Sequence, residues 1–372
     1  MTLHRTVKDK SCLTINPDLR LDSHRIYTEG DVLYNDMLHD IDSAKQSVFL
    51  ESYIFADDNV GRSFIRKLKS AAEKGIDVRL HIDAAGSKFA LSSEVECELI
   101  EHGVKIKYFH RWSCASPLRY NQRNHRKLLI IDNKTTYLGG FNIHEENSYH
   151  YYGAKRWRDT HLRLSHENGR GPNDLFLSFW QSLHTNVVKY EDQQGIIVTN
   201  INKQCKKTLH CTIQALLNQA DKYIYLTTPY FSPDRRTQAS LVNAVQRGVK
   251  VVLLLPHKSD VLLTKWAAQA SYQHLLNQGI EIFEYQRRVL HAKVIVTDKV
   301  SLLGSANIDY RSFFQNYEVY FMSTCNTFKE ELTACFVNDI ATAKNITIAE
   351  WANRMPTERI FELVGWAARK WL

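Results

Sequence analysis

The chain has 372 residues, of which 44% are hydrophobic and 24% are charged, a composition typical of soluble protein with packed cores. Lysine and arginine exceed aspartate and glutamate to give a net charge of +8. That excess favours an anionic partner such as a lipid headgroup surface, a nucleic acid or a phosphorylated small molecule, although solubility alone explains it about as well.

Seven cysteines are scattered along the chain without a CxxC pair. This spacing argues against a disulfide framework or a zinc site and is typical of a reducing compartment. No apolar stretch approaches the roughly 18–20 residues that a membrane-spanning helix needs. Residues 1–9 carry charges and lack the apolar centre of a secretion signal. We therefore expect a cytoplasmic protein that, if it acts on a membrane, acts from the membrane surface.

In chain order, the first predicted elements form a pattern that the second half of the chain repeats. Residues 48–58 (VFLESYIFADD) read as a buried strand ending in an acidic turn, and residues 224–234 (IYLTTPYFSPD) read the same way. Two further blocks, each predicted as a helix end, a glycine and a strand, follow in both halves. These blocks are residues 71–83 and 102–110 in the first half and residues 244–256 and 278–286 in the second.

A fourth pair of blocks closes each repeat. Residues 125–142 and 291–307 both begin with HxK, continue through an apolar strand and end in small residues with an asparagine. Each half is thus predicted as strand–helix–strand–helix–strand–strand, and helices on both faces of the sheet would explain strands that are apolar throughout. We expect an α/β protein of two tandem, pseudo-symmetric α/β/α sandwich halves with one active site between them.

The boundary between the halves is predicted in the polar, weakly periodic stretch at residues 190–205. Residues 172–188 are predicted to form a helix that closes the first half. We therefore divide the chain into residues 1–195, with the first HxK motif, and residues 196–372, with the second motif and a C-terminal amphipathic helix.

The two HxK motifs carry the residues that point to chemistry. Residues two apart in a strand share a face, so His125 and Lys127 are predicted to point one way together, as are His291 and Lys293. A single such motif usually contains an ordinary surface or core histidine whose hydrogen bonds are satisfied. Two copies with the same surroundings, inside otherwise apolar strands, favour a paired catalytic site.

An aspartate follows each histidine at the same offset. Asp132 and Asp298 lie seven positions after their histidines, so the alternation of side chains along a strand places them on the opposite face from the histidines. Turn-prone or charged residues follow both aspartates. The local pattern therefore favours structural aspartates at the strand ends.

Small residues and an asparagine come after each motif. The first half reads GGFN, ending at Asn142, and the second reads GSAN, with Ser305 and Asn307. Small residues allow close backbone approach, and an asparagine amide can donate to a phosphate oxygen. We expect these three side chains to bind substrate. Together with two imidazoles and two ammonium groups they would cradle a pentacoordinate phosphorus.

The two imidazoles supply complementary chemistry. A neutral imidazole can attack phosphorus and form a covalent intermediate, while an imidazolium can protonate the leaving alkoxide and later deprotonate the incoming alcohol or water. The lysines carry the charge that a metal would otherwise supply, so we expect neither a metal nor a cofactor. Asp159 and Glu318 are predicted to orient the histidines through their second ring nitrogens, with an ordinary ion pair as the alternative.

Two other segments each fit two interpretations. Residues 110–124 are basic and aromatic, and fit either a rim that attracts phosphate headgroups or a solvated loop. Residues 360–372 place apolar side chains at the spacing of one helix face. Packing against the core is the favoured role of that helix, and docking on an anionic bilayer is the alternative.

The two HxKxxxxD motifs, each followed by GGxN or GSxN, resemble those of the phospholipase D superfamily. Within it, the chain resembles bacterial-type cardiolipin synthases over nearly its full length. The segments that carry this resemblance are residues 50–55, 124–127, 157–160, 228–231, 304–312 and 316–318.

The resemblance implies one site between two halves and ping-pong transfer of a phosphatidyl group. It implies that His125 attacks while His291 does acid–base work, and it brings Asp132 and Asp298 into the candidate catalytic set as members of the motif. The acceptor would be the glycerol end of phosphatidylglycerol, giving cardiolipin. Partners would be a phospholipid substrate and an anionic membrane surface, with the protein peripheral on the inner face of the cell membrane.

Several alternatives stay open at this point. Many relatives begin with two membrane-spanning helices, and this chain would resemble shorter, peripheral members. The donor is either phosphatidylglycerol or phosphatidylethanolamine, and no motif predicts the oligomeric state. A phospholipase D that uses water and yields phosphatidic acid is the nearest alternative. A nuclease is less favoured because no recognised nucleic-acid-binding module or long basic run accompanies the charge, so we expect no nucleic-acid partner.

Overall fold

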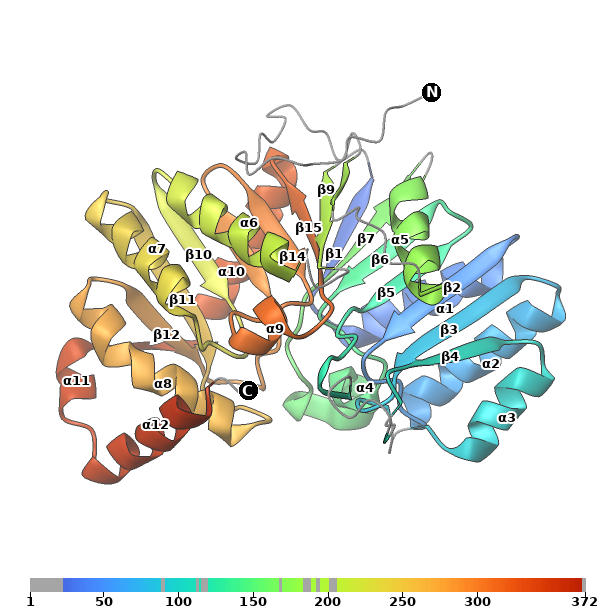
Figure 1. The fold of residues 1–372 in the computed structure, drawn as a ribbon, viewed down its shortest axis with the longest axis horizontal. Helices are drawn as coiled ribbons and strands as arrows, with labels where there is room; N and C mark the ends of the chain where they lie inside the picture. The colour runs from blue at the N-terminus through green and yellow to red at the C-terminus, as the bar shows by residue number, and fades with distance from the viewer. Residues whose placement is uncertain are drawn as a thin grey trace.

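The computed structural model describes residues 23–87, 91–111, 114, 120–166, 169–182, 189–191, 195–200 and 206–369, which form two α/β units side by side (Figure 1). Parts of the segments interpreted above lie outside the described residues: residues 1–9, residues 112–113 and 115–119 of the basic aromatic segment, residues 183–188 of the predicted closing helix, residues 192–194 and 201–205 of the predicted boundary, and residues 370–372 of the C-terminal run.

The first half is built on a seven-stranded mixed sheet. Its strands are β1 (His24–Tyr27), β2 (Ser47–Ser52), β3 (Asp77–Asp83), β4 (Lys105–Phe109), β5 (Leu128–Ile131), β6 (Thr135–Gly139) and β7 (His161–Ser165). The spatial order is β1-β7-β6-β5-β2-β3-β4. Strands β2, β3 and β4 run parallel, and the remaining neighbours are antiparallel.

The second half is built on a nine-stranded mixed sheet. Its strands are β8 (Lys189–Glu191), β9 (Ile196–Thr199), β10 (Tyr223–Thr227), β11 (Lys250–Pro256), β12 (Glu281–Tyr285), β13 (Val294–Thr297), β14 (Ser301–Gly304), β15 (Val319–Ser323) and β16 (Ala343–Ile346). The spatial order is β16-β12-β11-β10-β13-β14-β15-β9-β8.

The two sheets repeat one topology. The series β4-β3-β2-β5-β6-β7-β1 in the first sheet matches β12-β11-β10-β13-β14-β15-β9 in the second, with the same parallel and antiparallel neighbours. Strands β8 and β16 extend the second sheet at its two edges. The expected α/β fold of two pseudo-symmetric halves is confirmed, and β8, before residue 196, already belongs to the second sheet.

Helices follow the strands in the predicted order. They are α1 (Gly30–Ser43), α2 (Asn59–Glu73), α3 (Ser93–Glu101), α4 (Tyr149–Tyr152), α5 (Arg170–Trp180), α6 (Lys206–Gln219), α7 (Arg235–Gln246), α8 (Leu262–Asn277), α9 (Tyr310–Phe314), α10 (Asn326–Ile340), α11 (Ile348–Ala352) and α12 (Pro356–Ala368), with short 3-10 helices η2 (Glu145–Asn147) and η3 (Gly153–Lys155) beside α4.

Local chemistry explains where the repeated helices begin and end. The acidic residue that closes the first repeat block caps the next helix in both halves: the Asp58 side chain accepts from Gly61 N, and that of Asp234 accepts from Thr237 N. A left-handed glycine follows each of these helices, at φ +83° for Gly75 and +86° for Gly248.

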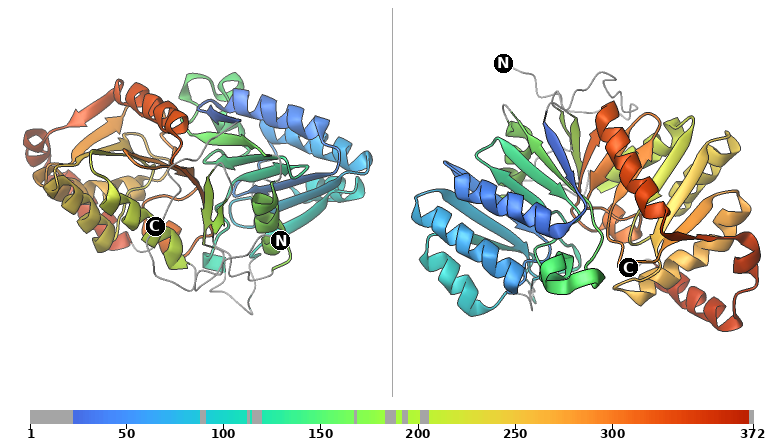
Figure 2. Two further views of the ribbon diagram at one scale, coloured as in Figure 1. Left: turned by 90° about the horizontal axis from the view of Figure 1, so that it is seen from above. Right: turned by 180° about the vertical axis from the view of Figure 1, so that it is seen from behind.

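An apolar cluster shared by both halves lies between the sheets. Phe49 and Leu128 of the first sheet belong to the same buried cluster as Val294 and Val319 of the second. Side chains of α5 and α10 complete it, while most of the other helices lie on the outer side of each half (Figure 2). The central strands are therefore almost entirely buried, because helices cover one face while α5, α10 and the opposite half cover the other. Within the described part of the chain, no helix is both long enough and apolar enough to cross a bilayer.

Candidate active site

The HxK segments lie at the sheet–sheet interface but just outside the strands. Strands β5 and β13 begin at Leu128 and Val294, so the expectation that the histidines and lysines lie inside these strands is wrong. Each segment is instead anchored by a residue from the opposite half. His125 N donates to Tyr317 O at 2.9 Å. His291 N donates to Arg158 O at 2.7 Å.

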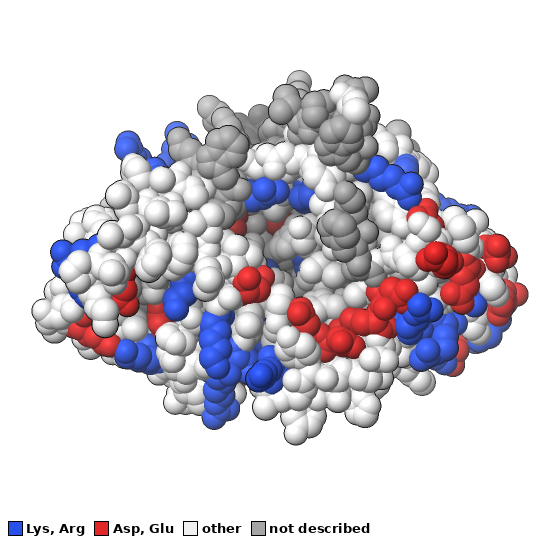
Figure 3. Space-filling view, turned by 90° about the horizontal axis from the view of Figure 1, so that it is seen from below, with Lys and Arg blue, Asp and Glu red and all other residues white. Residues whose placement is uncertain are grey.

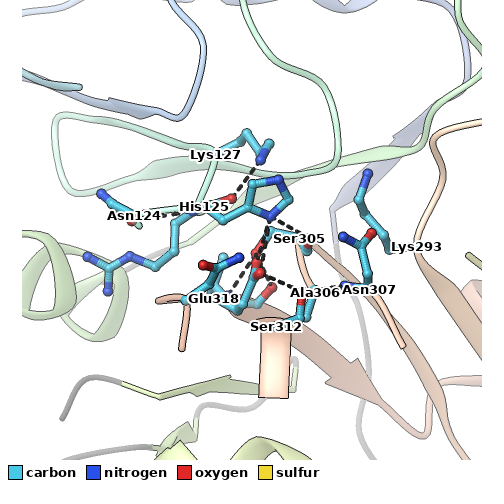
Figure 4. Close-up of polar contacts among 12 residues, drawn as sticks. Asn124, His125, Lys127, Lys293, Ser305, Ala306, Asn307, Ser312 and Glu318 are labelled. Atoms are coloured by element: carbon cyan, nitrogen blue, oxygen red, sulfur yellow. Dashed lines mark hydrogen bonds and ion pairs between the residues drawn. The ribbon is translucent and has the colours of Figure 1, made fainter. Parts of the chain in front are cut away.

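Each imidazole is held by the carboxylate of the opposite half. His125 Nδ1 lies 3.0 Å from Glu318 Oε2 and 3.1 Å from Ser305 O (Figure 4). His291 Nδ1 lies 2.5 Å from Asp159 Oδ2. A carboxylate on Nδ1 fixes the tautomer and leaves Nε2 as the nitrogen that can react. The two predicted orienting carboxylates are thus in place, but crosswise between the halves.

Glu318 sits in a cage of hydrogen-bond donors. Its oxygens accept from Ser305 Oγ at 2.6 Å and from Ser312 Oγ at 2.9 Å. Burial alone would raise the pKa of Glu318, but His125, Lys127 and the Ser305 hydroxyl together hold it below its ordinary value. Ser305, expected to bind substrate, is therefore engaged with this carboxylate. Ser312 was missed as a site residue, although it ends the segment 304–312 that begins with GSAN.

Asp159 occupies the equivalent place in tighter surroundings. Its Oδ1 accepts from Thr160 N at 2.7 Å. A Cβ on Gly140 would come within 1.9 Å of Asp159 Oδ1, so the carboxylate fits only because residue 140 has no side chain. Burial opposes ionisation of Asp159, and Lys293 and His291 outweigh it and lower its pKa. The small residue was expected to allow a close approach at this position, and the group that approaches Gly140 is the Asp159 carboxylate.

The two lysines are buried beside the imidazoles. Lys127 is 2% exposed and donates to His125 O at 2.7 Å. Lys293 is 1% exposed, with Nζ 2.8 Å from His291 Nδ1. Burial lowers the pKa of Lys127 well below its ordinary value, and the nearby Lys293 lowers it further. A buried lysine whose pKa a second lysine lowers lies in a site that an anion would stabilise.

Burial also favours the neutral form of both imidazoles. It lowers the pKa of His125 against the opposing charge of Glu318. For His291, burial reinforced by Lys293 lowers the pKa to about 4. Lys293 also contributes to the depressed pKa of His125, so the two motifs act on one region, and Figure 4 shows Lys293 beside the His125 ring.

The two predicted asparagines differ in their contacts. Asn142 Oδ1 accepts from Ile54 N at 3.2 Å and so supports the loop after β2. Asn307 Oδ1 is buried and has no hydrogen-bond partner among the described residues. Figure 4 places Asn307 next to Lys293, to the right of the His125 ring. The Asn307 amide beside Lys293 can donate from Nδ2 to a phosphoryl oxygen, which makes Asn307 the better substrate-binding candidate.

The motif aspartates lie away from the histidines. Asp132 accepts from the backbone N–H groups of Lys45, Gln46 and Ser47 at 2.7–2.9 Å. Asp298 accepts from the corresponding Asp221 N and Lys222 N at 3.0 and 3.2 Å. Both occupy turns at the far ends of β5 and β13, as the alternation argument expected. Their place in the catalytic set, taken from the motif, is corrected to a structural role.

The residues that precede the two carboxylates also cross between the halves. Arg158 forms a buried ion pair with Asp339 of α10, with Nη2 2.7 Å from Oδ2. Tyr317 packs edge-on against Phe109 and at a tilt against Phe179, at ring centroid distances of 5.2 and 5.1 Å. Asp339 was missed from the sequence because a single acidic residue on a helix gives no local signal.

A hollow opens at the centre of the molecule when it is seen from below (Figure 3). Lysine or arginine and acidic side chains are visible around and within this hollow, between the two halves. Its central position, between the sheets, agrees with the crosswise contacts of the histidines.

Comparison with known proteins supports the resemblance to phospholipase D-type enzymes that the sequence motifs indicate. The family described as "Cardiolipin synthase, PLD-like domain" matches residues 37–153 and 213–340. A cardiolipin synthase of Staphylococcus aureus is 31% identical over 363 residues, covering 92% of this chain and 71% of that protein. One of Clostridium perfringens is 30% identical over 381 residues, covering 96% and 77%.

The chain belongs to the cardiolipin synthase family of phospholipase D-like proteins. As a member, it is an enzyme of the phosphatidyltransferase and phospholipase D type. Two solved structures share the fold of this chain. A phosphatidylserine synthase of Haemophilus influenzae has a TM-score of 0.71 at 12% identity and covers 95% of this chain and 94% of that one. A polyphosphate kinase of Porphyromonas gingivalis has a TM-score of 0.62 at 13% identity, covering 88% and 49%.

Proposed function

We propose that the protein transfers a phosphatidyl group from one phospholipid to the glycerol end of phosphatidylglycerol and so makes cardiolipin. The relatives named above are cardiolipin synthases, which supports the substrate class. The observation that carries the mechanism is the crosswise holding of both imidazoles at Nδ1, with a buried lysine beside each.

In the first half-reaction, His125 Nε2 attacks the donor phosphorus. A phosphorus–nitrogen bond forms while the bond from phosphorus to the headgroup oxygen breaks. His291, protonated at Nε2, gives that proton to the departing oxygen, which leaves as a free alcohol. The negative phosphate raises the proton affinity of His291, which burial and Lys293 depress in the empty site.

In the second half-reaction, the roles reverse. His291 Nε2 removes the proton from a primary hydroxyl of phosphatidylglycerol, and the resulting oxygen attacks phosphorus. The phosphorus–nitrogen bond breaks and its electron pair returns to His125. Lys127, Lys293 and Asn307 offset the charge that gathers on the phosphoryl oxygens in both steps.

Product analysis tests the proposed reaction. We expect purified protein incubated with labelled phosphatidylglycerol vesicles, with and without phosphatidylethanolamine, to yield cardiolipin and a free headgroup alcohol. Comparing the two mixtures identifies the donor by mass spectrometry. Phosphatidic acid without any cardiolipin would instead establish hydrolysis, and salt-sensitive DNA cleavage without lipid turnover would establish a nuclease.

A donor with a p-nitrophenol headgroup tests the two histidine roles, because this group leaves without a proton. We expect His291→Ala to release p-nitrophenol and to accumulate an acid-labile phosphatidyl adduct on His125. The variant His125→Ala should do neither. An adduct that forms in His125→Ala but not in His291→Ala would reverse the assignment.

A further inference from the structure

Helix α12 packs with its polar side inward. Its buried residues are Glu362 and Gly365. Glu362 forms an ion pair with Arg354, at 2.8 Å from Oε2 to Nη2. A Cβ on Gly365 would lie 2.3 Å from Ala267 N, so the missing side chain lets α12 approach α8 closely. An ion pair, the glycine contact and the stacking of Phe361 on Trp266 of α8, at a ring centroid distance of 4.7 Å, therefore fasten this helix, without a buried apolar stripe.

Most of the large apolar side chains of α12 face outward instead. Ile360 is 61% exposed, Leu363 64% and Trp366 52%. Leu262, at the start of the adjoining α8, is 60% exposed. A contiguous group of large exposed apolar side chains marks an interaction surface. The sequence-based expectation that the apolar face packs on the core is wrong for this helix, because Glu362 and Gly365 occupy the inward positions.

The exposed face belongs to the side of the molecule on which the central hollow opens. Helices α12 and α4 lie along the lower edge of Figure 1, and Figure 3 views that edge from below. A wide uncharged surface adjoins the hollow in that view. On the other half, α4 exposes Tyr149 by 60% and Tyr151 by 46%. Each half thus places on this side a helix that has exposed apolar or aromatic side chains.

We propose that this side of the protein docks on a phospholipid bilayer, with α12 lying in the headgroup region and its exposed residues inserted. The proposal rests on the proposed function, because a phospholipid that enters the hollow comes from a bilayer held together by its acyl chains. Leucine, isoleucine and tryptophan are side chains that bind the interface between water and hydrocarbon, where tyrosine also accumulates. The chain's net charge of +8 complements an anionic bilayer.

Vesicle binding by the full chain tests the docking face without reference to turnover. We expect Leu363→Gln/Trp366→Gln to reduce co-sedimentation with vesicles of equal parts phosphatidylglycerol and phosphatidylcholine by at least about tenfold. The matched control is Val32→Gln/Val337→Gln, whose residues are 44% and 56% exposed on α1 and α10, two helices of the face seen from behind in Figure 2. The control should bind like the unaltered protein. Equal binding by all three proteins overturns the proposal.

Turnover on two forms of substrate separates docking from chemistry. The α12 variant should lose turnover on vesicles and keep it on a short-chain phosphatidylglycerol dissolved as monomers. Loss on both substrates would contradict a docking role. Failure of the unaltered protein to make cardiolipin would refute the proposed function and leave the vesicle-binding result intact. A dimer that becomes monomeric in the variant, with vesicle binding unchanged, would show that a second copy covers α12 and would overturn the bilayer assignment.

Discussion

The imidazole of His125 and the carboxylate of Glu318 meet at 3.0 Å although 193 positions of chain separate them. The equivalent contact between His291 and Asp159 joins residues 132 positions apart. Each reacting ring is therefore oriented by the half to which it does not belong. Any change in the packing of the two sheets moves a histidine relative to its carboxylate.

Replacing the carboxylate by its amide tests this orientation. Glu318→Gln keeps the shape of the side chain and removes the charge that stabilises the positive ring formed when His125 attacks phosphorus. We expect kcat to fall by about 10²–10⁴-fold with the fold intact. Glu350→Gln, in an exposed pair with Lys344, is the control and should leave kcat unchanged. Near-normal kcat in the first variant would rule out an orienting role.

Removal of either reacting imidazole tests the shared site. We expect His125→Ala and His291→Ala each to abolish detectable turnover of unmodified phospholipid, because neither half-reaction has a substitute group. Thermal unfolding should show that both variants remain folded, and His39→Ala, at an exposed position, should behave as the unaltered protein. Substantial turnover in either variant would refute a site built from both motifs.

The buried ion pair between Arg158 and Asp339 supports both stability and catalysis. Asp339→Ala leaves a guanidinium buried without its partner, so we expect the free energy of unfolding to fall by about 3–5 kcal/mol. Because Arg158 precedes Asp159, kcat should fall more than KM rises. The matched control is Asp221→Ala, which removes an exposed pair with Lys299 and should cost at most about 1 kcal/mol. Urea unfolding with steady-state kinetics distinguishes the two, and equal losses would contradict the predicted contribution.

The motif aspartate should behave in the opposite way from Glu318. Asp132→Asn weakens the acceptance of backbone N–H groups from the start of β2. Asparagine tolerates the left-handed backbone at this position, φ +53°. We expect a loss of about 1 kcal/mol in the free energy of unfolding and kcat within about twofold of normal. A large fall in kcat with stability preserved would restore Asp132 to the catalytic set.

The depressed pKa of His291 predicts how stability depends on pH. Burial and Lys293 lower this pKa from 6.5 to about 4, so the folded chain resists a proton that the unfolded chain accepts. The stability conferred by the neutral ring is fully present above pH 6.5 and is lost as the pH falls toward 4. We expect a loss of at most about 3 kcal/mol from this group across that window. Urea unfolding at several pH values should show a shallower decline for His291→Asn, and identical slopes would contradict the assignment.

Sequence patterns anticipated the repeated architecture well. The duplicated blocks predicted the central strands of both sheets, the helix caps at Asp58 and Asp234 agree with the expected acidic turns, and glycines end the intervening helices as expected. These features succeed because they depend on local propensity and on burial along one short segment. The edge strands β8 and β16 were not predicted, since short strands at a sheet edge leave little periodicity.

The sequence predicted most of the residues that form the site, but not the contacts between them. Sequence alternation gave no information on which half supplies the carboxylate to a given ring, because that depends on how two sheets pack. For the same reason Ser305 was interpreted as a phosphate ligand, although its hydroxyl lies on Glu318. Asp339 lies 181 positions from Arg158, and no local spacing connects them.

The exchange of carboxylates has a consequence for how this chain can vary. A duplicated gene usually gains a spare copy, in which one version preserves the activity while the other drifts. Here neither copy is complete by itself, since the carboxylate that orients each histidine comes from the other half. The duplication therefore provides no redundancy, and the two copies are constrained to change together at this seam while remaining free to diverge elsewhere.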